Sequence, residues 1–373
     1  MIFSVSEKDN LQQRIIISAA YYLLAFISLL FVYLFTNIKI SINKNDRFLL
    51  IFFIMLFFWS ITLTNTPLIY SFKILVNFIL GFLSIKLIYF YRERATKAIK
   101  FVLLINIIAI YFQQGFLLIT GEYINLHAEL FPFSRGDLEI IEFGKFYRFS
   151  GLHYEPGNYS IIVVLLLLLL NFLDKEKKSL FYFFAIFSII LTKSILGMFM
   201  AIILATIFFR KKMSTQFSFL QFSSSMVIIF SLIIFSGGKD YISSQFNNKD
   251  EFNSLQSKVT SFELFLERSS SEIFFGSGIH SNELISKSRI KGLVKDNGLA
   301  FNLTYSFGAL GLFFLVFIFL KYKSKSKWEK LLVFSLISIF KIGFLYPAIF
   351  VFLFILMENN YTDNKQVYFI NKG

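Results

Sequence analysis

The chain has 373 residues, of which 56% are hydrophobic and 16% are charged, and it contains 53 Phe, four Pro and no Cys. A soluble protein of this length would carry more charge and far less Phe, so the composition excludes a soluble domain. Without Cys there are no disulfides, thiol nucleophiles or cysteine metal sites. The net charge of +14 is spread over short connections between apolar runs, which explains it without a nucleic-acid partner.

Apolar runs of membrane length recur along the whole sequence and predict one integral membrane domain, 1–373, of the all-α, polytopic class. About eleven spans are predicted, within a range of 10–12: 15–36, 48–64, 68–90, 101–120, 157–173, 180–192, 195–209, 219–236, 299–320, 330–342 and 346–357. Several are shorter than the ~20 residues that cross a bilayer upright. The pair 180–209 is therefore a tight hairpin, and 330–357 is either two spans or one. No small-residue cleavage site follows the first run, so we expect no cleaved signal peptide.

Basic residues lie in the connections 37–47, 91–100, 174–179, 210–212 and 321–330. With the predicted spans, all of these connections fall on one side of the membrane, which the positive-inside rule identifies as cytoplasmic. The N-terminus is then outside and the C-terminus inside. Two long loops, 121–157 and 237–298, face outward and hold all three His and 14 of the 23 acidic residues. The polar chemistry of the protein is therefore expected on its outer face.

The second loop carries apolar residues spaced three to four apart between Phe252 and Leu266. This spacing predicts an amphipathic helix that lies on the bundle or in the interface. A purely structural lid is the alternative interpretation.

The segment 147–160 concentrates polar side chains where a span begins. Arg148, His153 and Glu155 lie within eight residues, and Pro156 then starts a hydrocarbon run. Proline suits the first turn of a helix, where its missing N–H removes no hydrogen bond. These side chains are therefore expected at the water–lipid boundary, where polar groups are costly to hold unless they have a use. The segment is our candidate for the functional site.

Further cations are predicted on the same face. Arg135 lies in the first loop, Lys193 at a short outer turn, and Arg289 near the end of the second loop. A pyrophosphate needs more than one cation, and the planar fork of arginine suits phosphate oxygens. Surface ion pairs in a solvated loop are the alternative for the arginines. Lys193 could instead only orient its hairpin.

Two polar positions in the second loop complete the candidate list. Asp296-Asn297 precedes the span 299–320. Asp296 therefore resembles Glu155 in its position, since each is an acid at the outer end of a predicted span. An Asp in this position is also an ordinary N-cap. His280 is a lone loop histidine, for which surface exposure is the alternative. No zinc or phosphate-loop motif occurs, so we expect no metal and no cofactor.

Two features of the spans have a structural interpretation. Lys73, Lys86 and Lys341 lie near span ends and can extend their ammonium groups to the interface. Gly308, Ala309 and Gly311 permit close packing of the span 299–320 against a neighbour. No pair of broken helices of the kind found in transporters is evident.

Several short stretches resemble a known family. Arg148-Phe-Ser-Gly-Leu-His-Tyr-Glu155-Pro-Gly-Asn158 resembles the R-x-S-G-x-x-x-E-P-N stretch of O-antigen and capsular polysaccharide polymerases of the Wzy type. Thr192-Lys-Ser-Ile-Leu-Gly197 is similar to the Ser/Gly outer turn after the next span in that family. Phe275-Gly-Ser-Gly278, Asp296-Asn297-Gly-Leu and Gly308-Ala-Leu-Gly311 resemble its G-x-G, D-[SN] and G-x-x-G tail. The order and placement of these motifs carry the resemblance, over some 40 positions between about 100 and 320.

The resemblance implies a membrane glycosyltransferase that polymerises undecaprenyl-diphosphate-linked oligosaccharide repeats into O-antigen or capsule. It implies a bacterial cytoplasmic (inner) membrane location, an outward-facing site, metal-independent chemistry, and partners such as a chain-length regulator and other polysaccharide assembly proteins. Arg148, helped by Lys193 and Arg289, would hold the donor pyrophosphate. Glu155 would take the proton from the acceptor hydroxyl, with His153 and Asp296 as alternatives; in the competing interpretation, Glu155 only pairs with Arg148 and holds the loop.

Two other functions stay open at this point. O-antigen ligases resemble the same family but typically carry His where this chain has Asp296, and Gly157 separates Pro156 from Asn158 where the family often has Asn directly after Pro. A flippase of the lipid-linked sugar is the third possibility. A transporter should have polar residues at the bilayer midplane, whereas the acids here lie in loops, which favours an enzyme.

Overall fold

The structure is a computed structural model that describes residues 23–24, 26–34, 42, 44–63, 68–130, 147–153, 155–174, 179–209, 262–263, 265–278, 297–322, 327–340 and 347–358. Within these residues every regular element is a helix. Helices long and apolar enough to cross a membrane cover Ser71–Phe90, Arg92–Thr120, Pro156–Leu173 and Leu299–Lys321. The prediction of an all-α chain with membrane helices is confirmed. The count of about eleven spans and the orientation stay predictions.

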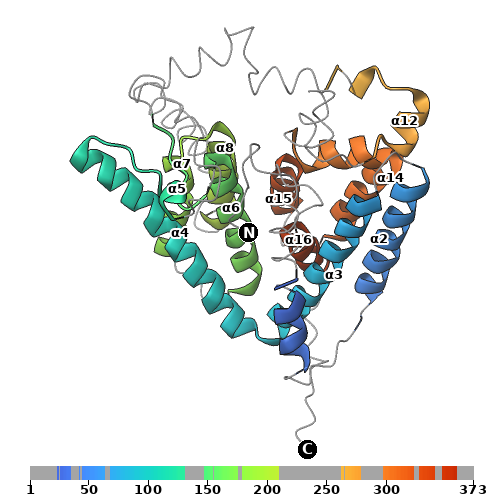
Figure 1. Cartoon of the computed structure of the whole chain (residues 1–373), viewed down its shortest axis with the longest axis horizontal. Coiled ribbons are helices and arrows are strands. Elements are labelled where there is room, and N and C mark those ends of the chain that lie inside the picture. The colour runs from blue at the N-terminus through green and yellow to red at the C-terminus, as the bar shows by residue number, and fades with distance from the viewer. Residues whose placement is uncertain are drawn as a thin grey trace, which may run out of the picture. The chain divides into compact units, whose positions relative to one another are not determined.

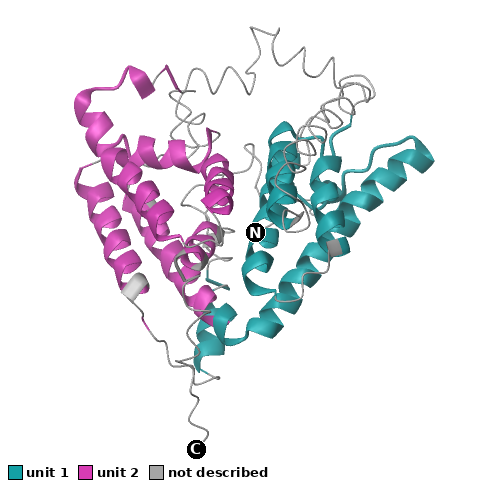
Figure 2. Ribbon diagram, turned by 180° about the vertical axis from the view of Figure 1, so that it is seen from behind, with its two compact units in different colours: residues 1–36, 88–260 teal, residues 37–87, 261–373 magenta. Residues whose placement is uncertain are grey.

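The chain divides into two compact units, each described here by itself (Figure 2). Unit 1 comprises residues 1–36 and 88–260, and unit 2 comprises 37–87 and 261–373. The predicted span 219–236 lies outside the described residues. The same holds for the predicted amphipathic helix, apart from a few residues at its C-terminal end.

Unit 1 is a bundle of α4 (Arg92–Thr120), α6 (Pro156–Leu173), α7 (Ser179–Leu191) and α8 (Ile195–Phe209), with the short α5 (Leu126–Leu130) after α4 (Figure 1). Helix α6 contacts the three other long helices. Ten of its residues are buried, because its hydrocarbon run is apolar on every face. The predicted hairpin is formed by α7 and α8, which the turn 192–194 connects.

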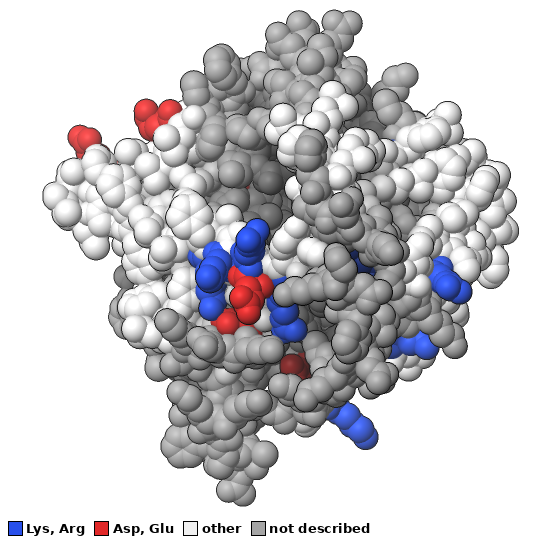
Figure 3. All heavy atoms as spheres, turned by 90° about the horizontal axis from the view of Figure 1, so that it is seen from below, with Lys and Arg blue, Asp and Glu red and all other residues white. Residues whose placement is uncertain are grey.

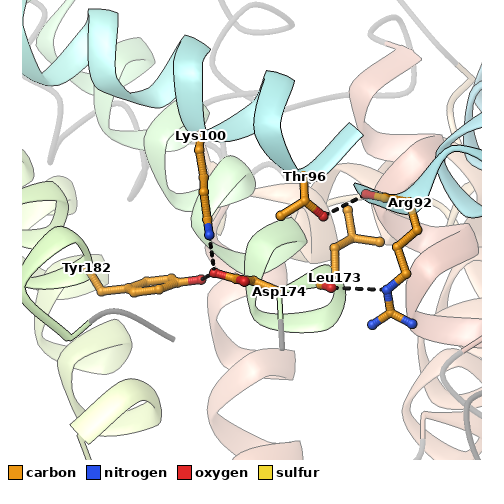
Figure 4. Close-up of polar contacts among 6 residues, drawn as sticks. All are labelled: Arg92, Thr96, Lys100, Leu173, Asp174 and Tyr182. Carbon is orange, nitrogen blue, oxygen red and sulfur yellow. Dashed lines mark hydrogen bonds and ion pairs between the residues drawn. The ribbon is translucent and has the colours of Figure 1, made fainter. Parts of the chain in front are cut away.

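The sequence predicts 91–100 as a connection before the span 101–120; in the structure this segment is helical from Arg92 and continuous with that span. Two charged residues of its first three turns are used in packing: Arg92 donates to backbone carbonyls at the end of α6, and Lys100 pairs with Asp174 (Figure 4). Cationic side chains at the C-terminus of a helix donate hydrogen bonds to its last carbonyl groups. They also interact favourably with the negative end of the helix dipole. These contacts hold a charged segment in a helix, although charge is typical of loops between spans.

Unit 2 contains α2 (Lys44–Thr62), most of α3 (Leu68–Phe90), α12 (Ser270–Phe275), α14 (Leu299–Lys321), α15 (Lys327–Ile339) and α16 (Pro347–Glu358). The region 330–357 therefore forms two helices, one of the two predicted possibilities. Aromatic rings fill the core; Phe52 stacks on Phe314 at 4.2 Å, and Phe53 meets Phe350 edge-on at 5.0 Å. Such pairs add stability beyond their buried area.

The expectation that Lys86 extends to the interface is wrong. Its side chain is buried, and its Nζ lies 2.6 Å from Asp46 Oδ2 in the first turn of α2. A buried ammonium is held by an opposite charge because the bilayer interior offers no water to solvate it. The ion pair therefore joins α2 to α3 inside unit 2.

Helix α14 is broken at Gly308, which has φ 56° and ψ −133°. The sequence predicts a span over 299–320 with small residues for close packing, and the structure adds a break inside this span that the sequence did not indicate. The N–H groups of Ser277 and Gly278 donate to the carbonyls of Tyr305 and Ser306 at 3.0 and 3.1 Å. Non-helical backbone at membrane depth persists only where such partners satisfy it. The predicted G-x-G and G-x-x-G motifs therefore meet at this break.

Candidate functional site

The segment before α6 folds into a tight turn. Gly151 has φ 59°, a conformation that favours glycine, and the backbone N–H of His153 donates to the Ser150 carbonyl at 3.0 Å. Glu155 is the extended N-cap residue, and Pro156 takes the first helical position, as the sequence predicted. The chain therefore reverses direction immediately before it starts the most buried helix of unit 1.

Two buried amide side chains of α4 hold this turn. Gln113 Oε1 accepts the Gly151 N–H at 2.7 Å, while its Nε2 donates to the Ile124 carbonyl at 2.9 Å. Asn106 Oδ1 lies 2.7 Å from His153 Nε2. Sequence reasoning missed both residues, and a signal existed: two amides seven residues apart in an apolar span lie on one helix face.

His153 is buried and its ring protonation is set by Asn106. The Nδ2 of Asn106 donates to the Val102 carbonyl at 2.9 Å, so its Oδ1 accepts and His153 Nε2 carries the hydrogen. The ring also meets Tyr159 edge-on, at a centroid distance of 5.6 Å. Burial is the main reason that the pKa of His153 falls from 6.5 to about 4. His153 is therefore neutral at physiological pH.

A second histidine that we had not singled out supports the turn from α5. His127 is buried, and its Nδ1 lies 2.9 Å from the Leu152 carbonyl. On the other side, the Tyr159 hydroxyl lies 2.8 Å from Ser188 Oγ of α7. The turn 150–153 is therefore held from α4, α5 and the first turns of α6.

The α7–α8 turn packs against the beginning of α6. Thr192 Oγ1 lies 3.3 Å from Ser160 Oγ, and a Cβ on Gly197 would overlap the same Ser160 oxygen. Lys193 has φ 53° and places its Nζ 5.7 Å from the ring centre of Phe149, the neighbour of Arg148. Burial lowers the pKa of Lys193. The structure thus brings the motif 192–197 against the motif 148–160.

Arg148 and Glu155 differ in their surroundings. Arg148 is half-buried, and its carbonyl accepts the Tyr123 hydroxyl at 3.3 Å. Tyr123 in turn stacks on Tyr147 at 5.5 Å. Glu155 is exposed, and its side chain makes no capping hydrogen bond to α6. No ion pair joins these two described residues, so nothing here supports the interpretation that Glu155 only holds Arg148.

Other predicted site residues lie elsewhere. Arg135, His280, Arg289 and Asp296 are outside the residues that the structure describes. Asn297 is described and belongs to unit 2, immediately before α14. Among the described residues, no group of three or more His, Asp or Glu could hold a metal ion.

The pKa of His153 predicts an acid-dependent loss of stability. The unfolded chain protonates His153 near pH 6.5, whereas the folded protein does so near 4. The unfolded state therefore binds the extra proton between these values, and stability falls as the pH drops through that window. The loss reaches about 3 kcal/mol near pH 4 and is complete only below it, and almost none of the His153 contribution is lost above pH 6.5.

The measurement is the thermal unfolding midpoint of the purified protein at pH 7 and pH 5. His153→Gln keeps a donor toward Asn106 and cannot titrate, so its midpoint should fall less on acidification. An equal fall in both proteins would show that His153 is not the buried titrating group.

No protein-family model, no curated protein and no solved structure matches this chain. The chemistry of the site is therefore argued from its own residues. These are Arg148 and Lys193, which are both half-buried, and the exposed carboxylate of Glu155 at the N-cap of α6; Lys193 Nζ lies over the ring of Phe149, the residue after Arg148. Such a set can bind an anionic group and accept a proton beside it.

Proposed function

We propose that this protein is a membrane glycosyltransferase that polymerises undecaprenyl-diphosphate-linked oligosaccharide repeats into O-antigen or capsular polysaccharide. One observation carries the proposal: two sequence motifs, 148–160 and 192–197, pack together at the mouth of α6 and bring Lys193 against the neighbour of Arg148. The cation Lys193 then lies beside the segment 148–155, which itself carries the cation Arg148 and the exposed acid Glu155. Such cations can bind a diphosphate donor, and such an acid can take the proton of a hydroxyl acceptor.

In the proposed reaction, Arg148 and Lys193 act on the diphosphate of the donor. The acceptor hydroxyl oxygen attacks the anomeric carbon of the donor sugar, and the bond from that carbon to the diphosphate oxygen breaks. Arg148 binds the diphosphate through its fork, and Lys193 supplies a second positive charge. Both stabilise the negative charge that develops on the leaving undecaprenyl diphosphate. Lys193 is well placed for this because partial burial strengthens its interaction with a nearby anion.

Glu155 is the favoured base that takes the proton of the acceptor hydroxyl. A base must reach the proton in a plausible substrate pose, and Glu155 is exposed at the N-cap of α6. His153 is buried and donates its Nε2 hydrogen to Asn106. These contacts favour a positioning role for His153. Asp296 stays a candidate from the sequence alone.

The flippase alternative is weaker than the enzyme. Transporter sites use broken helices whose freed backbone groups face the substrate. The break in α14 is different, since Ser277, Gly278 and Arg268 donate to the carbonyls beside it. The buried amides Asn106 and Gln113 are likewise hydrogen-bonded to the chain itself.

The proposal places the enzyme in the bacterial inner membrane with its site facing outward, where a chain-length regulator and other assembly proteins are its expected partners. The test is to incubate membranes containing the protein with the lipid-linked repeat and to resolve the product by gel electrophoresis. A ladder of increasing repeat number is expected. A single addition to a non-repeat acceptor would identify a ligase, and no glycosidic product would reject both enzymes.

A further inference from the structure

Helix α4 is longer than the hydrocarbon core of a membrane. Its 29 residues span about 44 Å at 1.5 Å per residue, whereas the core is about 30 Å thick. Residues 101–120 alone account for about 30 Å. The excess is the charged segment 92–100, which adds about 13 Å at one end. This end of α4 therefore extends into the headgroup layer of one leaflet.

One face of α4 continues from cations into exposed apolar side chains. Arg94 and Lys97 are exposed, and they precede Phe101, Ile108 and Phe112, which are 64%, 57% and 52% exposed. These positions are three, four or seven residues apart, so they lie on one helix face. A stripe of apolar side chains with cations at one end is complementary to an anionic phospholipid, in which a charged headgroup lies at one end of the acyl chains.

The other cations of this segment are already engaged with the bundle (Figure 4). The Nε and Nη2 groups of Arg92 donate to the Leu173 and Phe172 carbonyls, both at 3.0 Å. Lys100 Nζ lies 2.8 Å from Asp174 Oδ2, which also accepts the Tyr182 hydroxyl at 3.1 Å. These contacts fix the charged turns of α4 on α6 and α7. They leave Arg94 and Lys97 on the outer face.

The charge balance of this segment favours an anion. The described part of the chain shows Lys and Arg side chains gathered around acidic ones on one face (Figure 3). In α4 the only acid of the first three turns is Glu93, beside Arg94, while Asp174 is buried against Lys100. Arg94 also lies over the Tyr91 ring, 5.6 Å from its centre, and aromatic rings are enriched at this membrane depth.

We propose that Arg94 and Lys97 bind the phosphate headgroup of an anionic phospholipid, whose acyl chains lie along Phe101, Ile108 and Phe112. The two cations lie about 6–10 Å along the helix axis from Phe101, which matches the depth of the headgroup layer. The site belongs to unit 1 alone and does not depend on the proposed enzymatic function.

The test compares phosphatidylglycerol with phosphatidylcholine of the same acyl chains, bound to the purified full-length protein in detergent. Native mass spectrometry measures the two affinities. We expect the wild-type protein to prefer phosphatidylglycerol. The double variant Arg94→Gln, Lys97→Gln should lose about thirtyfold in affinity for it, roughly fivefold for each charge. High salt should reduce the wild-type preference.

Two control variants sharpen the result. Exchanging the cations, Arg94→Lys with Lys97→Arg, keeps the charge and should keep the preference. Glu93→Gln removes the neighbouring negative charge and should strengthen phosphatidylglycerol binding a few-fold. A wild-type protein that binds both lipids equally, or a neutralised variant that keeps the preference, would overturn the proposal. Full competition by inorganic phosphate would assign the cations to a free oxyanion and reject the lipid.

Discussion

Arg148→Lys and Glu155→Gln are each expected to reduce polymer formation by about 10²–10³, with normal amounts of protein in the membrane. Lysine keeps the positive charge at position 148 but loses the planar fork that binds two phosphate oxygens. Glutamine keeps the shape of Glu155 but cannot accept the proton of the acceptor hydroxyl. The measurement is the initial rate and chain length in the membrane assay with lipid-linked repeats.

Glu129→Gln provides the matched control. Glu129 is an exposed glutamate on α5 in the same predicted loop, so neutralising it should leave the rate unchanged. If Glu155→Gln makes polymer of near-wild-type length, Glu155 is not the base. If Arg148→Lys is fully active, Arg148 supplies charge or structure only, and the bidentate contact with the diphosphate is rejected.

Gly308→Ala is expected to destabilise the protein by roughly 2–6 kcal/mol, which should remove most folded protein from the membrane. The backbone there has φ 56° and ψ −133°, which L side chains rarely adopt. A Cβ at this position would also overlap the Phe274 carbonyl oxygen and lie 2.7 Å from the Gly276 nitrogen. These are backbone atoms, so no side chain can move aside to relieve the overlap.

Gly115→Ala is the control for this prediction. Gly115 lies in α4, and a Cβ added there would meet no atom within 4 Å. Alanine should therefore be neutral or stabilise by up to about 1 kcal/mol, because it favours helix more than glycine does. The measurement is the membrane abundance and thermal unfolding midpoint of both variants. Equal behaviour of Gly308→Ala and Gly115→Ala would show that α14 is a continuous helix.

Burial at the candidate site could not be predicted from local sequence. His153 and Glu155 are two residues apart and were both predicted as candidate bases. The structure buries the first against Asn106, 47 residues earlier, and exposes the second at the N-cap of α6. The partner of His153 lies inside the predicted span 101–120, where most side chains are apolar. Only the fold shows which of two neighbouring polar groups can meet a substrate.

Lys86 and Gly308 likewise show contacts inside the spans that could not be predicted from local sequence. The ammonium group of a lysine near a span end can either extend to the membrane interface or pair with a buried acid. Lys86 pairs with the acid, because Asp46 on another helix lies within reach. Gly308 permits close packing, as predicted, since an added Cβ would overlap backbone atoms of 274–276. It also breaks the helix, which the sequence did not indicate.

Local sequence is enough to predict the helical membrane class, the start of α6 at Pro156 and the α7–α8 hairpin. These follow from local physics, since hydrocarbon runs must hydrogen-bond their own backbone in lipid and proline favours a first turn. Local sequence does not predict that the helix α4 begins at Arg92 and not near 101. Charged residues such as Arg92 and Lys100 suggest a loop when read alone. They are helical here because α6 offers them Asp174 and its terminal carbonyls, more than 70 residues away.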